Sequence, residues 1–171
     1  MAFDQALAKG MVTVKTALAS YTLGANLENL IHTSATNFTG TGNTLANSIS
    51  GGGGADTLTG GGGADTLTGG SGADRFVFKA ADLASSDEIT DFSHAQGDKI
   101  DLSAIDANIN ASNNQAFTFI GTAGFTHVAG QLHYSGSGPL TLSGDLNGDG
   151  IADFTIKVDT SIGLVAGDFI L

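Results

Sequence analysis

A nine-residue repeat in the middle of the chain constrains its fold more than any other feature. Residues 51–59 and 60–68 both read GGGGADTLT, and residues 69–77 read GGSGADRFV. Weaker copies precede them at residues 42–50 (GNTLANSIS) and 24–32 (GANLENLIH). A fixed short period of this kind is typical of solenoids, in which each repeat packs against its neighbours along the chain.

Each repeat divides into a glycine-rich turn and a short strand. Glycine adopts positive φ angles without steric strain, so the first six residues can turn tightly with their carbonyls on one side. The last three, such as Thr57-Leu58-Thr59, favour a three-residue strand with the leucine inward. Two repeats then complete one coil, and residues eighteen apart stack. The predicted core consists of Leu58 and Phe76 on one side, and Ile31, Ile49 and Leu67 on the other.

Such a core is one side chain wide and buries little apolar surface, and the composition of the chain lowers the stability of the folded state further. Glycine contributes 26 of 171 residues, and glycine loses the most backbone freedom on folding. The chain carries 17 acidic and 6 basic residues, a formal net charge of −11, so its carboxylates repel one another in a compact state. Bound cations would reverse that repulsion. The same charge argues against binding to nucleic acid.

Calcium is the cation that suits the turns. Ca²⁺ takes about six to eight oxygen ligands from carboxylates and carbonyls in adaptable geometry, whereas Mg²⁺ needs strict octahedral geometry and transition metals favour histidine or cysteine. The strongest predicted site pairs Asp56 with Asp74. On the opposite edge, Asp65 depends on the weaker Asn47 or on a residue of the cap. The predicted carbonyl ligands are those of Gly51, Gly53, Gly60, Gly62, Gly70 and Gly72.

After residue 79 the glycine repeat stops and a β-rich region begins. An open last turn would expose core and strand edges, so a solenoid needs such a cap. We therefore predict an all-β protein: an entry segment with the first strands (1–35), a parallel β-roll that binds calcium (36–79) and a C-terminal β-rich cap (80–171). The apolar residues predicted for the core of the cap are Ile89, Phe92, Ile100, Leu102, Ile105, Phe117, Phe119, Ile120, Leu132, Tyr134, Leu140, Leu142, Phe154, Ile156 and Val158.

Two acidic groups in the cap leave alternatives open. Asp87 and Asp91, with Asp98 and Asp101, either complete the last calcium site or cap turns. The segment DLNGDGIADF (145–154) places Asp145, Asn147 and Asp149 at ligand positions of an EF-hand loop and Asp153 at the ninth position. A bidentate glutamate is missing from its twelfth position and no helices flank it. This segment is therefore either a calcium site or a polar hairpin turn between Leu142 and Phe154.

The repeats resemble the GGxGxDxUx nonapeptide of the repeats-in-toxin (RTX, hemolysin-type) family. The segments GADRFVF (72–78), DEITDF (87–92), GDKIDLS (97–103) and DFIL (168–171) are similar to the C-terminal region of serralysin-type secreted metalloproteases, and YTLGANLENL (21–30) looks like its strand-rich entry. The resemblance implies a parallel β-roll that binds several calcium ions and is capped by β-structure. It also implies an uncleaved C-terminal signal for type I secretion, read by an ABC transporter complex.

No motif in the chain indicates catalysis. The HExxH zinc helix of serralysins and a GxSxG elbow are both missing, and the four histidines (His32, His94, His127 and His133) are scattered. The first 20 residues do not form a cleavable secretory signal, and no apolar run approaches the ~20 residues of a transmembrane helix. We therefore expect a protein that is not an enzyme. The resemblance to the serralysin C-terminal region implies a bacterial extracellular protein, and we expect it to fold when it meets calcium outside the cell.

Two other functions remain open from the sequence. The chain is either an extracellular polysaccharide-binding or cell-surface module, as similar rolls in mannuronan epimerases suggest, or the non-catalytic tail of a secreted protease or lipase. The six basic residues and two tyrosines give little support to a glycan surface. An upstream catalytic domain would be the partner in the second case.

Overall fold

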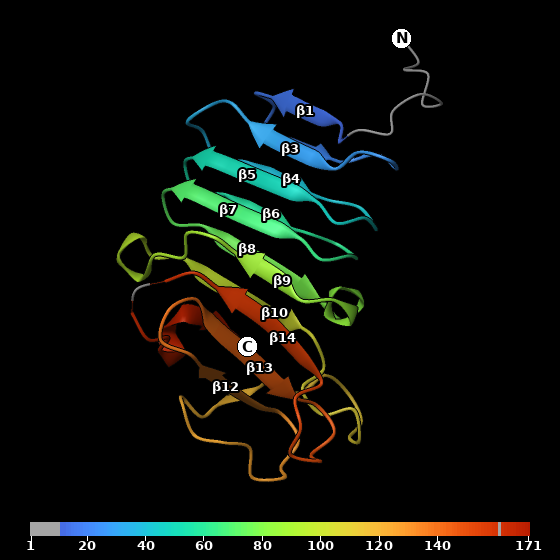
Figure 1. The fold of residues 1–171 in the computed structure, drawn as a ribbon, viewed down its shortest axis with the longest axis vertical. Helices are drawn as coiled ribbons and strands as arrows, with labels where there is room; N and C mark the ends of the chain where they lie inside the picture. Colours follow the sequence, from blue (N-terminus) through green and yellow to red (C-terminus); the bar gives the residue numbers. More distant parts are fainter. Residues whose placement is uncertain (1–10, 161) are drawn as a thin grey trace.

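A computed structural model describes residues 11–160 and 162–171 (Figure 1). Strands dominate this part of the chain, with three short 3-10 helices: η1 (Ala80–Ala84), η2 (His94–Gln96) and η3 (Ala166–Asp168). The strands are β1 (Thr13–Thr16), β2 (Ser20–Thr22), β3 (Asn29–His32), β4 (Thr39–Thr41), β5 (Ser48–Gly53), β6 (Thr57–Thr59), β7 (Thr66–Ser71), β8 (Arg75–Lys79), β9 (Asp87–Ile89), β10 (Lys99–Ala104), β11 (Thr118–Phe119), β12 (Gln131–Ser135), β13 (Leu140–Asp145), β14 (Phe154–Val158) and β15 (Phe169–Ile170).

The strands alternate between two sheets, as a coil with two strands per turn requires. One sheet has the order β1-β3-β5-β7-β9-β14-β13-β12-β11, and the other has the order β15-β10-β8-β6-β4-β2. Neighbouring strands from β1 to β10 are parallel. Both sheets run across the predicted boundaries at residues 35/36 and 79/80. The predicted parallel β-roll with a β-rich cap is confirmed.

The predicted eighteen-residue register is confirmed within the glycine repeats. Ile49 pairs with Leu67 and Leu58 pairs with Phe76, and all four side chains are fully buried. The strand β6 has the predicted three residues, whereas β5 and β7 extend into the following turn. The core is one side chain wide on each sheet, since only the middle apolar residue of each short strand points inward.

The prediction that Ile31 lies in this core is wrong. Leu30 pairs with Ile49, and Ile31 pairs with Ser50, because the irregular block 33–41 makes this coil one residue longer. A one-residue change of register moves every side chain to the other face. Leu30 is therefore fully buried and Ile31 is only half-buried.

In the same irregular block, Phe38 fills the space that Gly40 leaves in the core. Gly40 stacks on Leu58 in the apolar position and has no side chain to bury there. A Cβ atom on Gly40 would lie 2.7 Å from Cε1 of Phe38, so the ring of Phe38 fills this space from the turn. Phe38 is 2% exposed.

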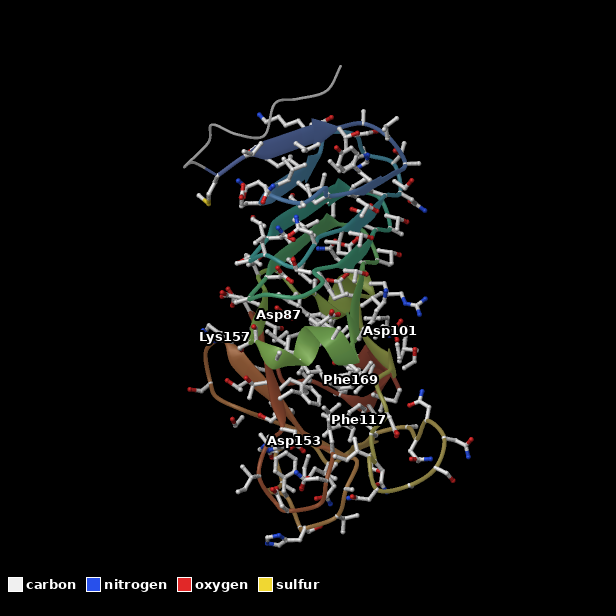
Figure 2. All side chains as sticks on the ribbon, turned by 90° about the vertical axis from the view of Figure 1, so that its right-hand side faces the viewer. Asp87, Asp101, Phe117, Asp153, Lys157 and Phe169 are labelled. Carbon is white, nitrogen blue, oxygen red and sulfur yellow. The ribbon has the colours of Figure 1, made fainter. Side chains whose placement is uncertain are left out.

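The cap continues the nine-stranded sheet, but with antiparallel pairing from β14 through β13 to β12. β9 pairs with β14 in parallel, and β14, β13 and β12 form an antiparallel meander. Phe117 and Phe169 lie in its interior (Figure 2), where Phe117 packs edge-on against Phe154 with ring centroids 5.8 Å apart. The other predicted core residues of the cap are buried, except that Phe119, Ile120 and Tyr134 are half-buried.

The N-terminal coils and the cap lie at opposite ends of the long axis (Figure 1). Between them are the glycine-rich turns, stacked along both edges of the roll. In residues 11–160 and 162–171, no helix has the length and apolar character needed to cross a membrane.

Candidate calcium-binding turns

On one edge of the roll, aspartates from successive turns form a ladder of hydrogen bonds. Oδ1 of Asp56 accepts the backbone N–H of Phe38 (2.9 Å), and Oδ1 of Asp74 accepts that of Asp56 (2.8 Å). Asp98 continues the ladder, because its Oδ1 accepts the N–H of Asp74 (2.9 Å). The structure therefore brings together the predicted pair Asp56 and Asp74, and Asp98 extends it into the cap.

The opposite edge carries a second ladder. Oδ1 of Asp65 accepts the N–H of Asn47 (2.7 Å), and Oδ1 of Asp87 accepts the N–H of Asp65 (2.8 Å). Asp82, on η1, lies near enough for its charge to act on both Asp65 and Asp87. All three carboxylates are at most 3% exposed. Both partners predicted for Asp65, Asn47 and a residue of the cap, therefore lie beside it. Asp82 is an addition that the sequence did not suggest.

The second oxygen of each repeat aspartate is buried and has no hydrogen-bond partner. This holds for Oδ2 of Asp56, Asp65 and Asp74. Each oxygen faces the first glycine of its own turn, and a Cβ atom there would lie 2.2 Å from it at Gly51, 2.2 Å at Gly60 and 2.3 Å at Gly69. A buried charged oxygen without a partner costs folding free energy. A hard cation would remove that cost, so the residues present fit calcium.

The turns come so close to one another that backbone carbonyl oxygens of one turn lie beside the glycines of the next. A Cβ atom on Gly70 would lie 2.1 Å from the carbonyl oxygen of Gly52, and one on Gly72 would lie 1.9 Å from that of Gly54. These positions also have φ angles between 90° and 124°, which glycine tolerates. Gly70 pairs with Gly52, whereas Gly53 pairs with Ser71. The predicted carbonyl set thus mixes the first and third positions of the turn (Gly51, Gly53, Gly60 and Gly62) with the second and fourth positions (Gly70 and Gly72).

Side chains alone do not make up these sites. Among the described residues, no three His, Cys, Asp or Glu side chains gather closely enough to hold a metal ion. An ion bound between the turns would take most of its ligands from backbone carbonyls. Gly69 also belongs with the candidate residues, because it faces the unpartnered oxygen of Asp74. It is the first residue of the third repeat, as Gly51 and Gly60 are of the first two, so the sequence repeat could have identified it.

Burial raises the pKa of the turn carboxyls. The pKa rises to about 6 for Asp65 and Asp74 and to about 7 for Asp87, with loss of solvation as the largest cause in each case and neighbouring carboxylates adding to it. Burial also raises the pKa of Asp56, Asp82 and Asp98, against hydrogen bonds from backbone N–H groups. Without a cation, the folded roll therefore holds protons more tightly than the unfolded chain does.

The calcium-free protein is expected to become less stable as the pH rises from 4 to 8. A carboxyl whose folded pKa is raised contributes stability that is fully present below its unfolded pKa of about 3.9 and is lost as the pH rises through 6 to 7. The β-rich far-UV circular dichroism signal of calcium-stripped protein, recorded without denaturant at several pH values between 4 and 8, checks this. A signal that grows between pH 5 and 8 would contradict it.

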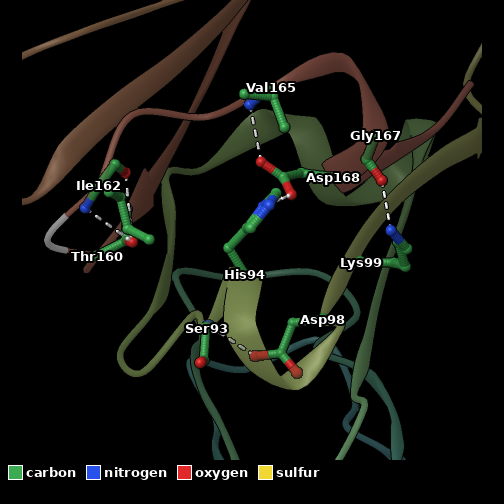
Figure 3. Close-up of polar contacts among 9 residues, drawn as sticks. All are labelled: Ser93, His94, Asp98, Lys99, Thr160, Ile162, Val165, Gly167 and Asp168. Carbon is green, nitrogen blue, oxygen red and sulfur yellow. Dashed lines mark hydrogen bonds and ion pairs between the residues drawn. The ribbon is translucent and has the colours of Figure 1, made fainter.

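The carboxylates after the last repeat are hydrogen-bonded within the fold. Asp91 accepts the N–H of Gly69 (2.9 Å) and of Gly70 (2.7 Å), one on each oxygen. The second oxygen of Asp98 accepts the N–H of Ser93 (2.8 Å; Figure 3). Both side chains therefore cap turns in the structure, and a calcium ligand role for Asp91 stays a prediction.

Asp101 lies on the other side of the roll from Asp87 (Figure 2). It pairs with Arg75, whose Nε lies 2.7 Å from Oδ2, and accepts hydrogen bonds from Ser103. Burial by itself would raise its pKa, but these hydrogen bonds and the guanidinium outweigh it and hold the pKa below its ordinary value. Asp101 is therefore an ion-paired structural carboxylate.

The second candidate loop connects β13 to β14 as an antiparallel hairpin. Asp145 is fully buried, and its two oxygens accept the N–H groups of Gly148 (2.6 Å) and Gly150 (2.9 Å). Asp153 accepts the N–H of Leu146 (2.6 Å) and an amide hydrogen bond from Asn147 (3.0 Å).

The remaining groups of this loop are also bonded to one another. Oδ1 of Asn147 accepts the N–H of Asp149, and Oδ1 of Asp149 accepts that of Ile151. The structure thus supports the hairpin-turn alternative, and calcium binding by Asp145, Asn147, Asp149 and Asp153 stays a prediction.

Comparison with known protein families identifies the family of this chain. The family model for the peptidase M10 serralysin C-terminal region matches residues 25–171, so the chain belongs to this family, which is the non-catalytic C-terminal part of serralysins. Among solved structures, the solution structure of the AlgE6R3 subunit from the Azotobacter vinelandii mannuronan C5-epimerase is 22% identical, covers 86% of this chain and 80% of that chain, and gives a TM-score of 0.31. No curated protein matches the chain.

Proposed function

We propose that this protein is a calcium-binding roll that folds when it meets calcium outside the cell. The observation that carries the proposal is the set of three buried, unpartnered carboxylate oxygens, on Asp56, Asp65 and Asp74. These side chains, with glycine carbonyls of their own and neighbouring turns, would hold the ions. Calcium would neutralise charge between stacked turns and take part in no reaction.

The energetics of the roll explain why folding would depend on the ion. Each coil buries about two apolar side chains, such as Leu58 and Leu67, while ordering each residue of the backbone costs about 1–2 kcal/mol. Three buried carboxylates whose pKa values burial raises add a further cost at neutral pH. Because calcium would bind the folded turns and not the unfolded chain, its binding free energy would become folding free energy.

Cytosolic free calcium is far below the dissociation constants of about 10⁻⁴–10⁻³ M that are typical of extracellular calcium modules. In the cell the chain would stay unfolded. After export it would fold around the ions.

Removal of calcium is expected to abolish the β-rich circular dichroism spectrum, and excess calcium is expected to restore it cooperatively. The test is a calcium titration of chelator-treated protein, followed by far-UV circular dichroism, with magnesium at the same concentrations as the control cation. A cooperative β-rich fold that persists in excess chelator at pH 7.5 would refute the proposal.

Membership of the serralysin C-terminal family supports a second part of the proposal, secretion through a type I ABC transporter complex. The C-terminal residues are docked in the fold: Phe169 pairs with Ile100 across β15 and β10, and Asp168 is 1% exposed and accepts a hydrogen bond from His94 (2.6 Å; Figure 3). A transporter that reads this segment would thus have to meet it before the cap folds. Unchanged export of a chain lacking residues 168–171 would argue against the signal.

A further inference from the structure

The coil before the glycine repeats, residues 32–50, lacks the buried, unpartnered oxygens of the repeats at 51–77. We call this coil the first coil of the roll. In the turn at residues 42–47, Asn47 replaces the aspartate and lies in the same place, with Oδ1 2.4 Å from where a Cβ atom on Gly42 would be. This oxygen accepts the backbone N–H of Asn43 at 2.7 Å. The equivalent oxygens of Asp56, Asp65 and Asp74 accept nothing.

The amide nitrogens of the same turn bind carbonyl oxygens of the turn above. Nδ2 of Asn47 donates to the carbonyl of Leu27 (3.0 Å). Nδ2 of Asn43 donates to the carbonyls of Gly24 and Leu27 (2.8 Å each). Two side-chain amides thus converge on one backbone carbonyl between two stacked turns.

That carbonyl lies one position after the carbonyls that face the next turn lower in the roll. Because Leu30 pairs with Ile49, Leu27 is the counterpart of Ala46 and not of Leu45. The carbonyls of Leu45 and Gly54 point at the next turn, 2.6 Å and 1.9 Å from where Cβ atoms on Gly63 and Gly72 would lie. Between the turns at 24–29 and 42–47, the carbonyl of Leu27 is bound by N–H groups of the two asparagines.

The other edge of the roll shows the same substitution with different residues. His32 is the structural counterpart of Gly51, since their neighbours Ile31 and Ser50 pair, and Phe38 occupies the aspartate position. Nδ1 of His32 lies 2.9 Å from the carbonyl oxygen of Gly51. Because a carbonyl oxygen only accepts, the imidazole donates.

The rings of His32 and Phe38 stack face to face, with centroids 4.4 Å apart and planes 5° from parallel. They fill the space that a glycine and a carboxylate occupy one turn below. The first turn on this edge therefore has an aromatic pair where an ion would need an acidic ligand.

We infer that side-chain N–H groups of Asn43, Asn47 and His32 take the place of calcium in the first coil of the roll. These residues determine where the ions begin: the ions bind from Gly51 toward the cap and not between the turns at 24–29 and 42–47. The inference rests on the proposed calcium function and changes the role expected of Asn47 from ligand to substitute for the ion.

Counting bound ions tests this inference. Native mass spectrometry in saturating calcium is expected to give the same number of ions for the wild type and Asn47→Ala. The double variant Asn43→Gly/Asn47→Asp, which restores the glycine and aspartate of the repeat, is expected to bind one ion more. Loss of one ion in Asn47→Ala would overturn the inference and make Asn47 a ligand.

Two further readouts keep the test decisive. If the variants do not fold, wild-type crystals grown with calcium are expected to show anomalous density beside Asp56, Asp65 and Asp74 and none between the turns at 24–29 and 42–47. Density beside the carbonyl of Leu27 would overturn the inference alone. A folded wild type that binds no calcium would overturn the proposed function, and with it any substitution for the ion.

Discussion

Replacing Phe76 with alanine is expected to lower the free energy of unfolding of the calcium-loaded protein by about 3–5 kcal/mol. Domains of ordinary size are stable by only about 5–15 kcal/mol, so the variant would lose a large part of the free energy of unfolding of the wild type. The measurement is urea unfolding in excess calcium, followed by circular dichroism.

The size of this effect follows from where Phe76 lies. It is fully buried and stacks between Leu58 of the coil above and Ile100 of the coil below. Its ring also contacts that of Phe92, with centroids 6.5 Å apart. In a core one side chain wide there are few neighbours that could move into the cavity, so the protein cannot recover much of the lost contact.

Val77→Ala is the matched control for this substitution. Val77 is the next residue on β8, points to the opposite face of the sheet and is only half-buried. Its truncation is expected to cost less than about 1 kcal/mol. Equal effects at Phe76 and Val77 would mean that the inner face of β8 does not carry the core.

The regular part of the fold was predictable because the sequence repeats there. In residues 51–77 the turn glycines, the aspartates and the inward residues recur at one spacing, so stacking of Leu58 on Phe76 follows from counting. The exchange of Ile31 for Leu30 was not predictable, since the extra residue in block 33–41 has no mark of its own. The ring of Phe38 beneath Gly40 depends on contact through space.

The candidate sites show the same division. The stacked pair Asp56 and Asp74 follows from the repeat, as does the pairing of Asp65 with Asn47. The approach of Asp82 to Asp65 could not be predicted, because η1 lengthens the coil between Leu67 and Ile89 to 22 residues. The sequence therefore predicts which residues stack where the repeat is regular. After an insertion such as η1, the position of a residue depends on tertiary packing.

Asp74→Asn is expected to change stability in opposite directions with and without calcium. The asparagine keeps Oδ1, which accepts the N–H of Asp56, and replaces the unpartnered Oδ2 with an NH₂ group. In calcium the variant loses an ion ligand. If that removes one ion, at free calcium about one hundred times its dissociation constant, the loss of stability is about 2.7 kcal/mol.

In calcium-free buffer at pH 7.5 the sign is expected to reverse. Burial raises the pKa of Asp74 to about 6, and the charges of Asp98, Asp56 and Asp91 add to the rise. The folded protein therefore bears the cost of an ionised, buried carboxylate at this pH, and a neutral amide of the same shape removes it. Because the wild type is expected to be unfolded in chelator at pH 7.5, the comparison uses refolding by an excluded osmolyte such as trimethylamine N-oxide. The variant is expected to regain the β-rich circular dichroism spectrum at the same osmolyte concentration as the wild type or at a lower one.

Glu88→Gln is the matched control, because it removes the same charge from a half-buried side chain on β9 that lies outside the turns. It is expected to shift neither the calcium midpoint nor the number of bound ions. Stability is measured by urea unfolding in calcium and by osmolyte-induced folding in chelator, and the ions are counted by native mass spectrometry. If Asp74→Asn destabilised the protein equally in both buffers, the carboxylate would act through packing and hydrogen bonding alone. The change of sign is therefore the result that separates an ion ligand from a structural aspartate.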